Sequence, residues 1–209
     1  MRGLFVVFEG VDGAGKSSQL ARLAARVAAT GREVVRLVEP THGPLGGEIR
    51  RRAREGPPLS AREELDLFVA DRRQNVADNV RPALARGAVV LQDRYYFSTA
   101  AYQAARPELG LSPADVVALH AGWAPRPDVV LLLDLPVARG LERVARRGAH
   151  DAFEEVGRQE AVRRTLLDLA AGDERFAVVD AGLGEEAVAE QVWARVGPLL
   201  AGQEPSSAP

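Results

Sequence analysis

The sequence predicts an α/β fold in which a five-stranded parallel sheet is flanked by helices. Three observations support this prediction. Five short apolar runs alternate with helical patterns, and repeated strand–helix–strand units favour a parallel sheet. Glycine follows several of the helical patterns, where helices commonly end. Polar residues also follow four of the apolar runs, at the sheet edge where open α/β sheets bind ligands.

The strands and helices are assigned in order from the apolar spacing. Buried strands are predicted at residues 4–8, 33–38, 88–92, 129–134 and 176–180. Helices are predicted at residues 16–29, 45–54, 61–86, 113–121, 137–147, 153–171 and 185–200. Together they indicate a single domain over residues 1–200, followed by a disordered tail over residues 201–209.

Residues at the ends of these helices support the assignment. Ser60 and Ser112 can cap two helix N-termini, and Glu63 stands three residues after Ser60, which is the spacing of a capping box. Three glycines lie just past predicted helix ends, as C-terminal caps do: Gly31, Gly87 and Gly172.

Composition excludes several classes of protein. The chain has no cysteine, which excludes disulfides and thiolate metal sites, and its net charge of -2 provides no global basic field for nucleic acid. The arginine-rich stretch at residues 50–54 is therefore interpreted as a solvated helix face. The three histidines, His42, His120 and His150, lie far apart and are interpreted as surface or capping residues. With no signal peptide and no apolar run near the roughly 20 residues of a membrane span, we expect a cytoplasmic protein without membrane partners.

A glycine-rich loop after the first strand indicates phosphate binding. The stretch GVDGAGKS fits the P-loop pattern G-x-x-x-x-G-K-[ST] and stands between a predicted strand and a predicted helix. Its backbone N–H groups and the helix N-terminus attract phosphate oxygens, Lys16 neutralises them, and Ser17 binds the Mg²⁺ that bridges them. The predicted ATP-binding residues of this loop are Gly10, Val11, Asp12, Gly13, Ala14, Gly15, Lys16, Ser17 and Ser18.

The lysine in this loop is unusual for the chain. Of the 27 basic residues, Lys16 is the only lysine and the other 26 are arginines. Since the chain otherwise uses arginine for its cations, the exception indicates that a compact ammonium group is required. The same count argues against a switch GTPase, because the usual guanine-reading element Asn-Lys-x-Asp needs a second lysine. An ATPase and a small-molecule kinase remain open at this point.

Several segments resemble the thymidylate kinase family of nucleoside monophosphate kinases. The resemblance is carried by LQDRYYFSTAAYQAAR at residues 91–106, together with FEGVDGAGK, EPTHGPLGGEIR, LFVADRRQ, PDVVLLLDLP and RRGAHDAFE. It implies a P-loop NTPase fold of the nucleoside monophosphate kinase type, with a short lid at about residues 143–154. It further implies transfer of a phosphoryl group from ATP to dTMP with Mg²⁺, giving dTDP and ADP, by a homodimer.

The resemblance also implies roles for individual residues. Phe68 stacks on the thymine, Arg72 binds the edge of the base, and Tyr102 lies against the deoxyribose. Arg94 binds the acceptor phosphate, while Asp93 joins Ser17 at the metal. Asp12 approaches the acceptor sugar or a metal-bound water. The full set of expected substrate-binding residues is Glu39, Arg50, Phe68, Arg72, Arg94, Ser98, Thr99, Tyr102 and Gln103.

Three departures from the family pattern bear on acceptor selectivity and on catalysis. Thr41-His42-Gly43 replaces the usual Gly-Gly-Thr beside the acceptor pocket. Gly13 and Ala152 stand where other members carry an arginine in the P-loop or in the lid. The cation that stabilises the transition state is therefore expected from Arg143, Arg146 or Arg147, and Arg143 and Arg147 are favoured. Arg143 is also expected to bind ATP. Arg158 is the next candidate if none of the three has this role. The expected catalytic residues are Lys16, Arg94, Asp12, Arg143 and Arg147.

Two rival functions remain beside this interpretation. The first is a P-loop kinase for another deoxynucleotide or nucleoside, suggested by the altered loop at residues 41–43. The second is a nucleotide-binding regulatory module with weak catalysis, suggested by that loop and by Ala152.

Overall fold

The computed structural model describes residues 2–55, 59–145 and 153–201. Five parallel strands form one sheet in the order β2-β3-β1-β4-β5, which confirms the predicted fold class. The strands are β1 (Leu4–Glu9), β2 (Val34–Val38), β3 (Val89–Asp93), β4 (Val129–Asp134) and β5 (Phe176–Asp180).

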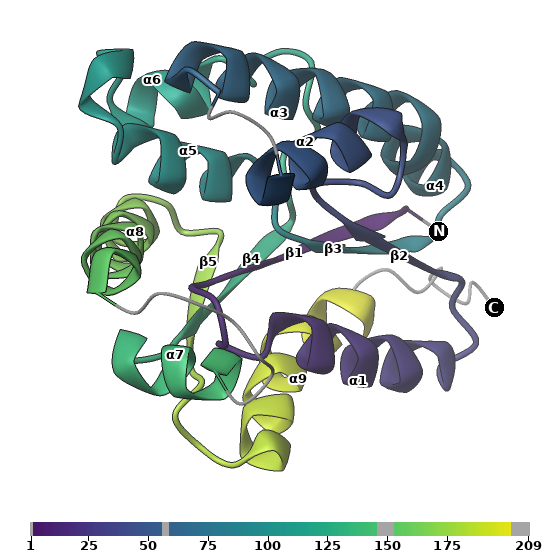
Figure 1. Cartoon of the computed structure of the whole chain (residues 1–209). Helices are drawn as coiled ribbons and strands as arrows, with labels where there is room; N and C mark the ends of the chain where they lie inside the picture. The colour runs from purple at the N-terminus through teal and green to yellow at the C-terminus, as the bar shows by residue number, and fades with distance from the viewer. Residues whose placement is uncertain (1, 56–58, 146–152, 202–209) are drawn as a thin grey trace, which may run out of the picture.

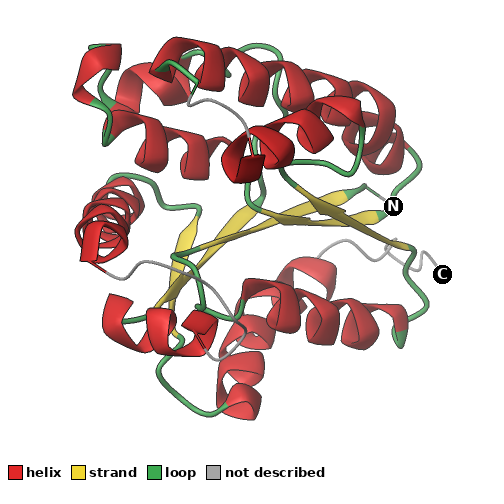
Figure 2. Cartoon of the chain, in the orientation of Figure 1, coloured by secondary structure: helices red, strands yellow, loops and turns green. Residues whose placement is uncertain are grey.

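Helices cover both faces of this sheet. Figure 1 shows α2 to α6 on one side of the sheet and α1, α7 and α9 on the other, and Figure 2 shows the strands as a single layer between them. Helix α8 contacts β4, β5, α5 and α7. The helices are α1 (Lys16–Ala28), α2 (Pro44–Glu55), α3 (Ala61–Asn75), α4 (Arg81–Ala85), α5 (Tyr96–Ala104), α6 (Pro113–Ala118), α7 (Val137–Ala145), α8 (Phe153–Ala171) and α9 (Glu185–Ala201).

The central strands are buried because both faces of the sheet are covered. Every residue of β1 and β3 is buried, and both strands read as nearly continuous apolar runs, as parallel strands do. The edge strands β2 and β5 are only partly buried. The order of strands brings the ends of β1 and β3 together, and the phosphate loop follows β1 directly.

Two elements differ from the sequence-based expectation. The apolar spacing does not predict α5, because the aromatic run Tyr95-Tyr96-Phe97 hides the start of a helix. The single helix expected at residues 61–86 is divided into α3, a π-helical turn over Val76–Val80, and α4. Pro82 has no N–H for the carbonyl of Asp78 and its ring crowds that carbonyl, which favours a widened turn just before it.

The predicted caps are largely confirmed. The Ser60 hydroxyl accepts from the Glu63 N–H and the Glu63 carboxylate accepts from the Ser60 N–H, and Ser112 forms the same box with Asp115. The two glycines Gly31 and Gly87 take positive φ values of 80° and 86°, which suit glycine, whereas Gly172 does not take a positive φ.

Several expectations concern residues that the structure does not describe. Residues 146–147 of the helix predicted at 137–147, most of the lid at 143–154, and residues 202–209 of the tail lie outside the described residues. The limits of the domain therefore stay a prediction. Among the described residues, no helix is both long enough and apolar enough to cross a membrane.

Candidate active site

The phosphate loop joins the end of β1 to the start of α1. Gly13 and Gly15 have φ values of 78° and 91°, which side chains other than glycine rarely adopt. A Cβ on Gly13 would also lie well inside van der Waals contact with the carbonyl of Gly140 in α7. An arginine at position 13 therefore could not stand here without moving α7, which explains why this chain has no cation at that place in the loop.

Lys16 lies inside this loop at the first turn of α1. Its side chain is only 7% exposed, and its Nζ donates to the carbonyl oxygens of Gly10 and Val11, both at 2.9 Å. Burial and, to a smaller extent, the charge of nearby Arg94 lower the pKa of Lys16, and the carboxylates of Asp93, Asp12 and Glu9 oppose them, so that the pKa is about 8. Both hydrogen-bond partners of the ammonium are neutral carbonyls, so its charge is available to an anion.

Ser17 and Asp93 meet beside the loop. The Ser17 Oγ donates to Oδ2 of Asp93 at 2.6 Å, which joins the start of α1 to the end of β3. Hydroxyl and carboxylate oxygens are the ligand type that Mg²⁺ prefers, so this pair fits that ion. Within the described residues, no group of three or more His, Cys, Asp or Glu side chains could hold a metal. An ion at Ser17 and Asp93 would therefore depend on water and phosphate oxygens for its other ligands.

A cavity of about 270 Å³ opens between α3, α5 and α8. All the expected substrate-binding residues except Arg50 line it, and Asp12 and Arg158 do so as well. Phe68 and Arg72, four residues apart on α3, both face this space. The Arg50 guanidinium instead donates to the carbonyl oxygens of Pro40 and Thr41, at 2.7 and 2.6 Å, and so holds the loop after β2.

A larger, more open cleft of about 720 Å³ lies on the side of β2. Its lining includes Ser17, Asp93, Thr41, His42 and Asn75. The Ser17–Asp93 pair therefore borders this cleft rather than the 270 Å³ cavity. Arg94, the next residue after Asp93, borders the smaller cavity, so the end of β3 separates the two spaces.

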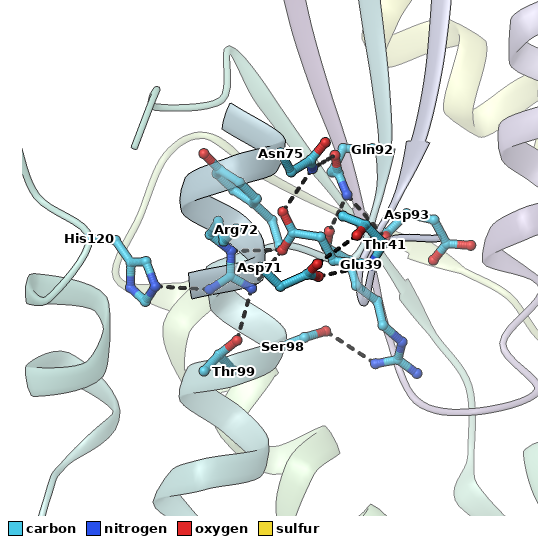
Figure 3. A network of polar contacts seen from close by, with 12 residues as sticks. Glu39, Thr41, Asp71, Arg72, Asn75, Gln92, Asp93, Ser98, Thr99 and His120 are labelled. Atoms are coloured by element: carbon cyan, nitrogen blue, oxygen red, sulfur yellow. Dashed lines mark hydrogen bonds and ion pairs between the residues drawn. The ribbon is translucent and has the colours of Figure 1, made fainter. Parts of the chain in front are cut away.

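Arg72 is the centre of a buried polar network (Figure 3). It is 1% exposed, and its Nε donates to Glu39 at 2.7 Å while its Nη2 donates to the Thr99 hydroxyl at 2.9 Å. Asn75 donates to the second Glu39 oxygen at 2.9 Å. Burial raises the pKa of Glu39, and Arg72 and Asn75 counteract that rise by stabilising the carboxylate. The network fixes the position of the Arg72 guanidinium at the wall of the cavity.

His120 belongs to the same network, so it is not a surface residue, although its ring does cap the C-terminal end of α6 at the carbonyl of Val116. It is 2% exposed, and its Nδ1 lies 2.8 Å from the carbonyl of Val116, which can only accept a hydrogen bond. The Nδ1 therefore carries the proton, and Nε2 accepts from Arg72 Nη1 at 2.8 Å. Burial and the charge of Arg72 lower the pKa of His120 to about 3, which keeps the ring neutral. His42 is exposed, and His150 lies outside the described residues.

Arg94 occupies a sharp turn at the end of β3. Its φ of 65° is unusual for a residue other than glycine, and such strained positions cluster at functional sites. The guanidinium is ion-paired to Asp12 of the phosphate loop and donates to the Ser98 hydroxyl at 3.1 Å. The buried Glu9 at the end of β1 accepts from the backbone N–H groups of Tyr95 and Ser98, which holds this turn in place.

Arg143, the one predicted lid arginine that the structure describes, does not line the 270 Å³ cavity. Arg143 of α7 donates to the carbonyl oxygens of Gly13 and Ala181, at 3.2 and 3.3 Å, and so links the phosphate loop to the loop after β5. Arg147 and Arg146 lie outside the described residues.

The pattern of residues gave no signal for Gln159 of α8, which lies against the phosphate loop. Its Nε2 donates to Asp12 Oδ2 at 3.1 Å, and its Oε1 accepts from the Asp12 N–H at 3.3 Å. A glutamine some 147 positions from its partner in sequence has no motif spacing that could identify it.

Two buried polar atoms at the cavity have no hydrogen-bond partner among the described residues. They are Oε1 of Gln103 and the hydroxyl of Tyr95, and both side chains line the cavity. Since buried polar groups are nearly always paired, these atoms indicate that the cavity receives a polar ligand or water.

Comparison with known proteins agrees with this geometry. The family model described as Thymidylate kinase matches residues 8–192. A protein of Akkermansia muciniphila named Thymidylate kinase is 43% identical over 191 residues, which cover 91% of this chain and 90% of that protein. Proteins of the same name from Xanthomonas euvesicatoria pv. vesicatoria and Xanthomonas campestris pv. campestris are each 42% identical over 200 residues, covering 95% of this chain and 85% of theirs.

Proposed function

The chain belongs to the thymidylate kinase family, and from that premise we propose how its residues carry out the reaction. The enzyme transfers a phosphoryl group from ATP to dTMP, giving dTDP and ADP. One observation carries the assignment of the two sites. Arg94, which lines the 270 Å³ cavity, is ion-paired to Asp12 of the phosphate loop. A monophosphate in the cavity and a triphosphate on the loop would therefore meet beside this pair.

The donor site is the phosphate loop. The ATP phosphates bind the backbone N–H groups of residues 10–18, and Lys16 exchanges its two carbonyl partners for phosphate oxygens. Arg143 supports the donor side, because its guanidinium already contacts the loop at Gly13.

Ser17 and Asp93 are the residues that would hold Mg²⁺. Bound there, the ion neutralises charge on the phosphate oxygens and orients the phosphoryl group. Their short hydrogen bond places both oxygens at one point beside the first turn of α1, which supports this assignment.

The acceptor site is the 270 Å³ cavity. Phe68 stacks on the thymine and Arg72, held by Glu39 and His120, donates to the edge of the base. Gln103 offers its unpaired Oε1 to the same edge, and Tyr102 contacts the sugar. These roles are supported by the position of each side chain in the lining and by the polar groups left for a ligand.

Phosphoryl transfer depends mainly on the positioning of the two substrates and on the neutralisation of their negative charge. The acceptor phosphate carries about 1.5 to 2 negative charges at pH 7, so its oxygen attacks the γ-phosphorus of ATP without a general base. As the new P–O bond forms, the bond to the bridging oxygen of ADP breaks. Arg94 holds the acceptor phosphate, and Asp12, released from Arg94, turns towards the sugar.

An acceptor panel tests the function. Purified protein is given MgATP with dTMP, dCMP, dGMP or thymidine, and ADP release is measured. We expect dTMP to be the preferred acceptor. Preference for dCMP or dGMP would favour a different deoxynucleotide kinase, and nucleotide binding without acceptor-dependent ADP release would favour a regulatory module.

Three further properties are proposed on the family resemblance and on composition: a homodimer, no nucleic-acid partner, and a cytoplasmic location. The net charge of -2 supports the lack of a nucleic-acid partner, and the absence of cysteine supports the cytoplasmic location. Light scattering after gel filtration tests the dimer, which should have twice the mass of one chain.

A further inference from the structure

The charges that line the acceptor cavity are paired with one exception. The lining contains three carboxylates, and each has an arginine partner. Glu39 pairs with Arg72, Asp12 with Arg94, and Glu64 with Arg106. Three arginines line the cavity, and the charges of two of them, Arg72 and Arg94, are therefore offset by carboxylates of the protein.

Arg158 is the exception. It lines the cavity from α8, its side chain is exposed, and it forms no ion pair with any side chain that the structure describes. Its Cζ lies 5.5 Å from the centroid of the Tyr102 ring, and the Cζ of Arg94 lies 5.3 Å from the same centroid. Two guanidinium groups therefore lie over one aromatic ring, at the place where Asp12 borders the cavity.

The backbone next to Arg158 is held close to the phosphate loop. The adjacent residue, Gln159, exchanges two hydrogen bonds with Asp12, through the Asp12 N–H and its carboxylate. Helix α8 is thus held against the loop at Gln159, and the long side chain of Arg158 extends from the neighbouring position over Tyr102.

We propose that Arg158 binds the phosphate of the acceptor nucleotide, as the second arginine of a clamp whose first arginine is Arg94. The proposal rests on the acceptor site assigned above. A phosphate dianion that displaced Asp12 from Arg94 would meet one guanidinium there and a second at Arg158, which gives a charge of about +2 opposite the acceptor. Gly13 and Ala152 carry no charge, so Arg158 also supplies a cation where the phosphate loop offers only Lys16.

A plain surface arginine is the alternative explanation. Arginine side chains often lie over aromatic rings and stabilise a helix by packing alone. The two explanations differ in what a ligand must contain. A phosphate clamp responds to the phosphate of dTMP and not to the nucleoside, whereas a packing role affects both ligands through the shape of the cavity.

Paired ligands provide the test. The variants are Arg158→Ala, Arg158→Lys and the control Arg164→Ala, an exposed arginine of the same helix that does not line the cavity. The measurements are KM for dTMP, KM for MgATP, and the constant for competitive inhibition by thymidine, with circular dichroism and thermal melting to check folding. We expect Arg158→Ala to raise KM for dTMP about 10- to 100-fold, to change the thymidine and MgATP constants less than about twofold, and Arg158→Lys to be intermediate. Arg164→Ala should behave as the wild type.

Other results overturn the proposal. An unchanged KM for dTMP in Arg158→Ala, or equal weakening of dTMP and thymidine, would assign Arg158 to packing. Weakening of MgATP alone would place it on the donor side. If the wild-type protein does not phosphorylate dTMP, the proposed function itself is contradicted. If the wild type is active and Arg158→Ala has the same KM for dTMP, only the role of Arg158 is contradicted.

Discussion

Lys16 shows how much a single residue can decide. It is the only lysine of the chain, which has 26 arginines. The residue is 7% exposed, and its Nζ donates to two backbone carbonyl oxygens. A planar guanidinium is wider and presents its donors in a fixed fork, so it cannot replace a point charge in this space. The confined position of Nζ therefore supports the prediction that the loop requires an ammonium group.

The first prediction concerns this exchange. Lys16→Arg should lower kcat/KM by at least about 100-fold, equivalent to about 2.7 kcal/mol of transition-state stabilisation, while the fold is retained. Steady-state kinetics with MgATP and dTMP, together with a thermal melt, measure both. The reverse exchange Arg22→Lys on the exposed face of α1 is the control and should leave turnover unchanged. Near-wild-type turnover in Lys16→Arg would show that charge alone is sufficient.

The second prediction concerns Phe68. Its side chain lines the 270 Å³ cavity, the proposed acceptor site, as Arg72 does. Stacking of a base on an aromatic side chain contributes about 1–3 kcal/mol, so Phe68→Ala should raise KM for dTMP roughly tenfold or more and leave KM for MgATP unchanged. The same variant should weaken inhibition by thymidine equally, because the base is present in both ligands. Equal loss of affinity for MgATP and dTMP would mark Phe68 as an ordinary core residue.

At the scale of elements, the phosphate loop and α7 touch through their backbones. A Cβ on Gly140 would lie well inside van der Waals contact with the carbonyl oxygen of Asp12, and Gly13 meets the carbonyl of Gly140 in the same way. Two glycines thus allow α7 to pack directly on the loop that binds phosphate. The sequence predicts that Gly13 belongs to the loop, but nothing in it shows that Gly140 is its partner.

The third prediction tests this contact. Gly140→Ala should destabilise the protein by about 1–3 kcal/mol, because the added methyl group meets backbone that cannot yield easily, and should lower kcat by displacing the loop. Gly157→Ala in α8 is the matched control. Nothing lies within 4 Å of a Cβ built there, so the same substitution should stabilise the helix by about 0.5–1 kcal/mol. Chemical denaturation of both variants measures the difference. A Gly140→Ala variant as stable and as active as the wild type would show that α7 moves aside without cost.

At the scale of the whole molecule, the sequence predicts the strands of the sheet, but it predicts only in part how the helices pack around the cavity. The five strands follow from continuous apolar runs, since strands covered on both faces contain few polar residues. The P-loop follows from local spacing, since its residues are consecutive. The 270 Å³ cavity is built from side chains of several helices and loops, and family motifs were needed to associate Phe68 with Tyr102. The sequence does not assign His120 or Gln159 to the site and offers Arg158 only as a further candidate for the transition-state cation, because it does not give the rotation of a helix about its axis.

His120 links the polar network around Arg72 to the stability of the whole protein. It follows α6 and its Nε2 accepts from Arg72 of α3, whose other partners come from the end of β2 and from α5. The charges of Arg72 and Arg73 both oppose its protonation. A charged His120 would have to give up the hydrogen bond to Arg72 and would leave two cations together in a buried place.

The last prediction is the pH dependence that follows. The pKa of His120 is about 3 in the folded protein against an ordinary value of 6.5, so the unfolded chain binds more protons between these values. Stability should therefore rise with pH through this window and be complete above about 6.5, with a slope of up to about 1.4 kcal/mol per pH unit from this group. Urea denaturation from pH 4.5 to 8 measures it. His120→Gln should be less stable than the wild type at pH 7.5, because Arg72 loses its partner, yet its stability should fall less steeply below pH 6.5. Above pH 6.5 the two curves should run parallel, which serves as the internal control. Equal slopes below pH 6.5 would show that another group governs the acid sensitivity of the fold.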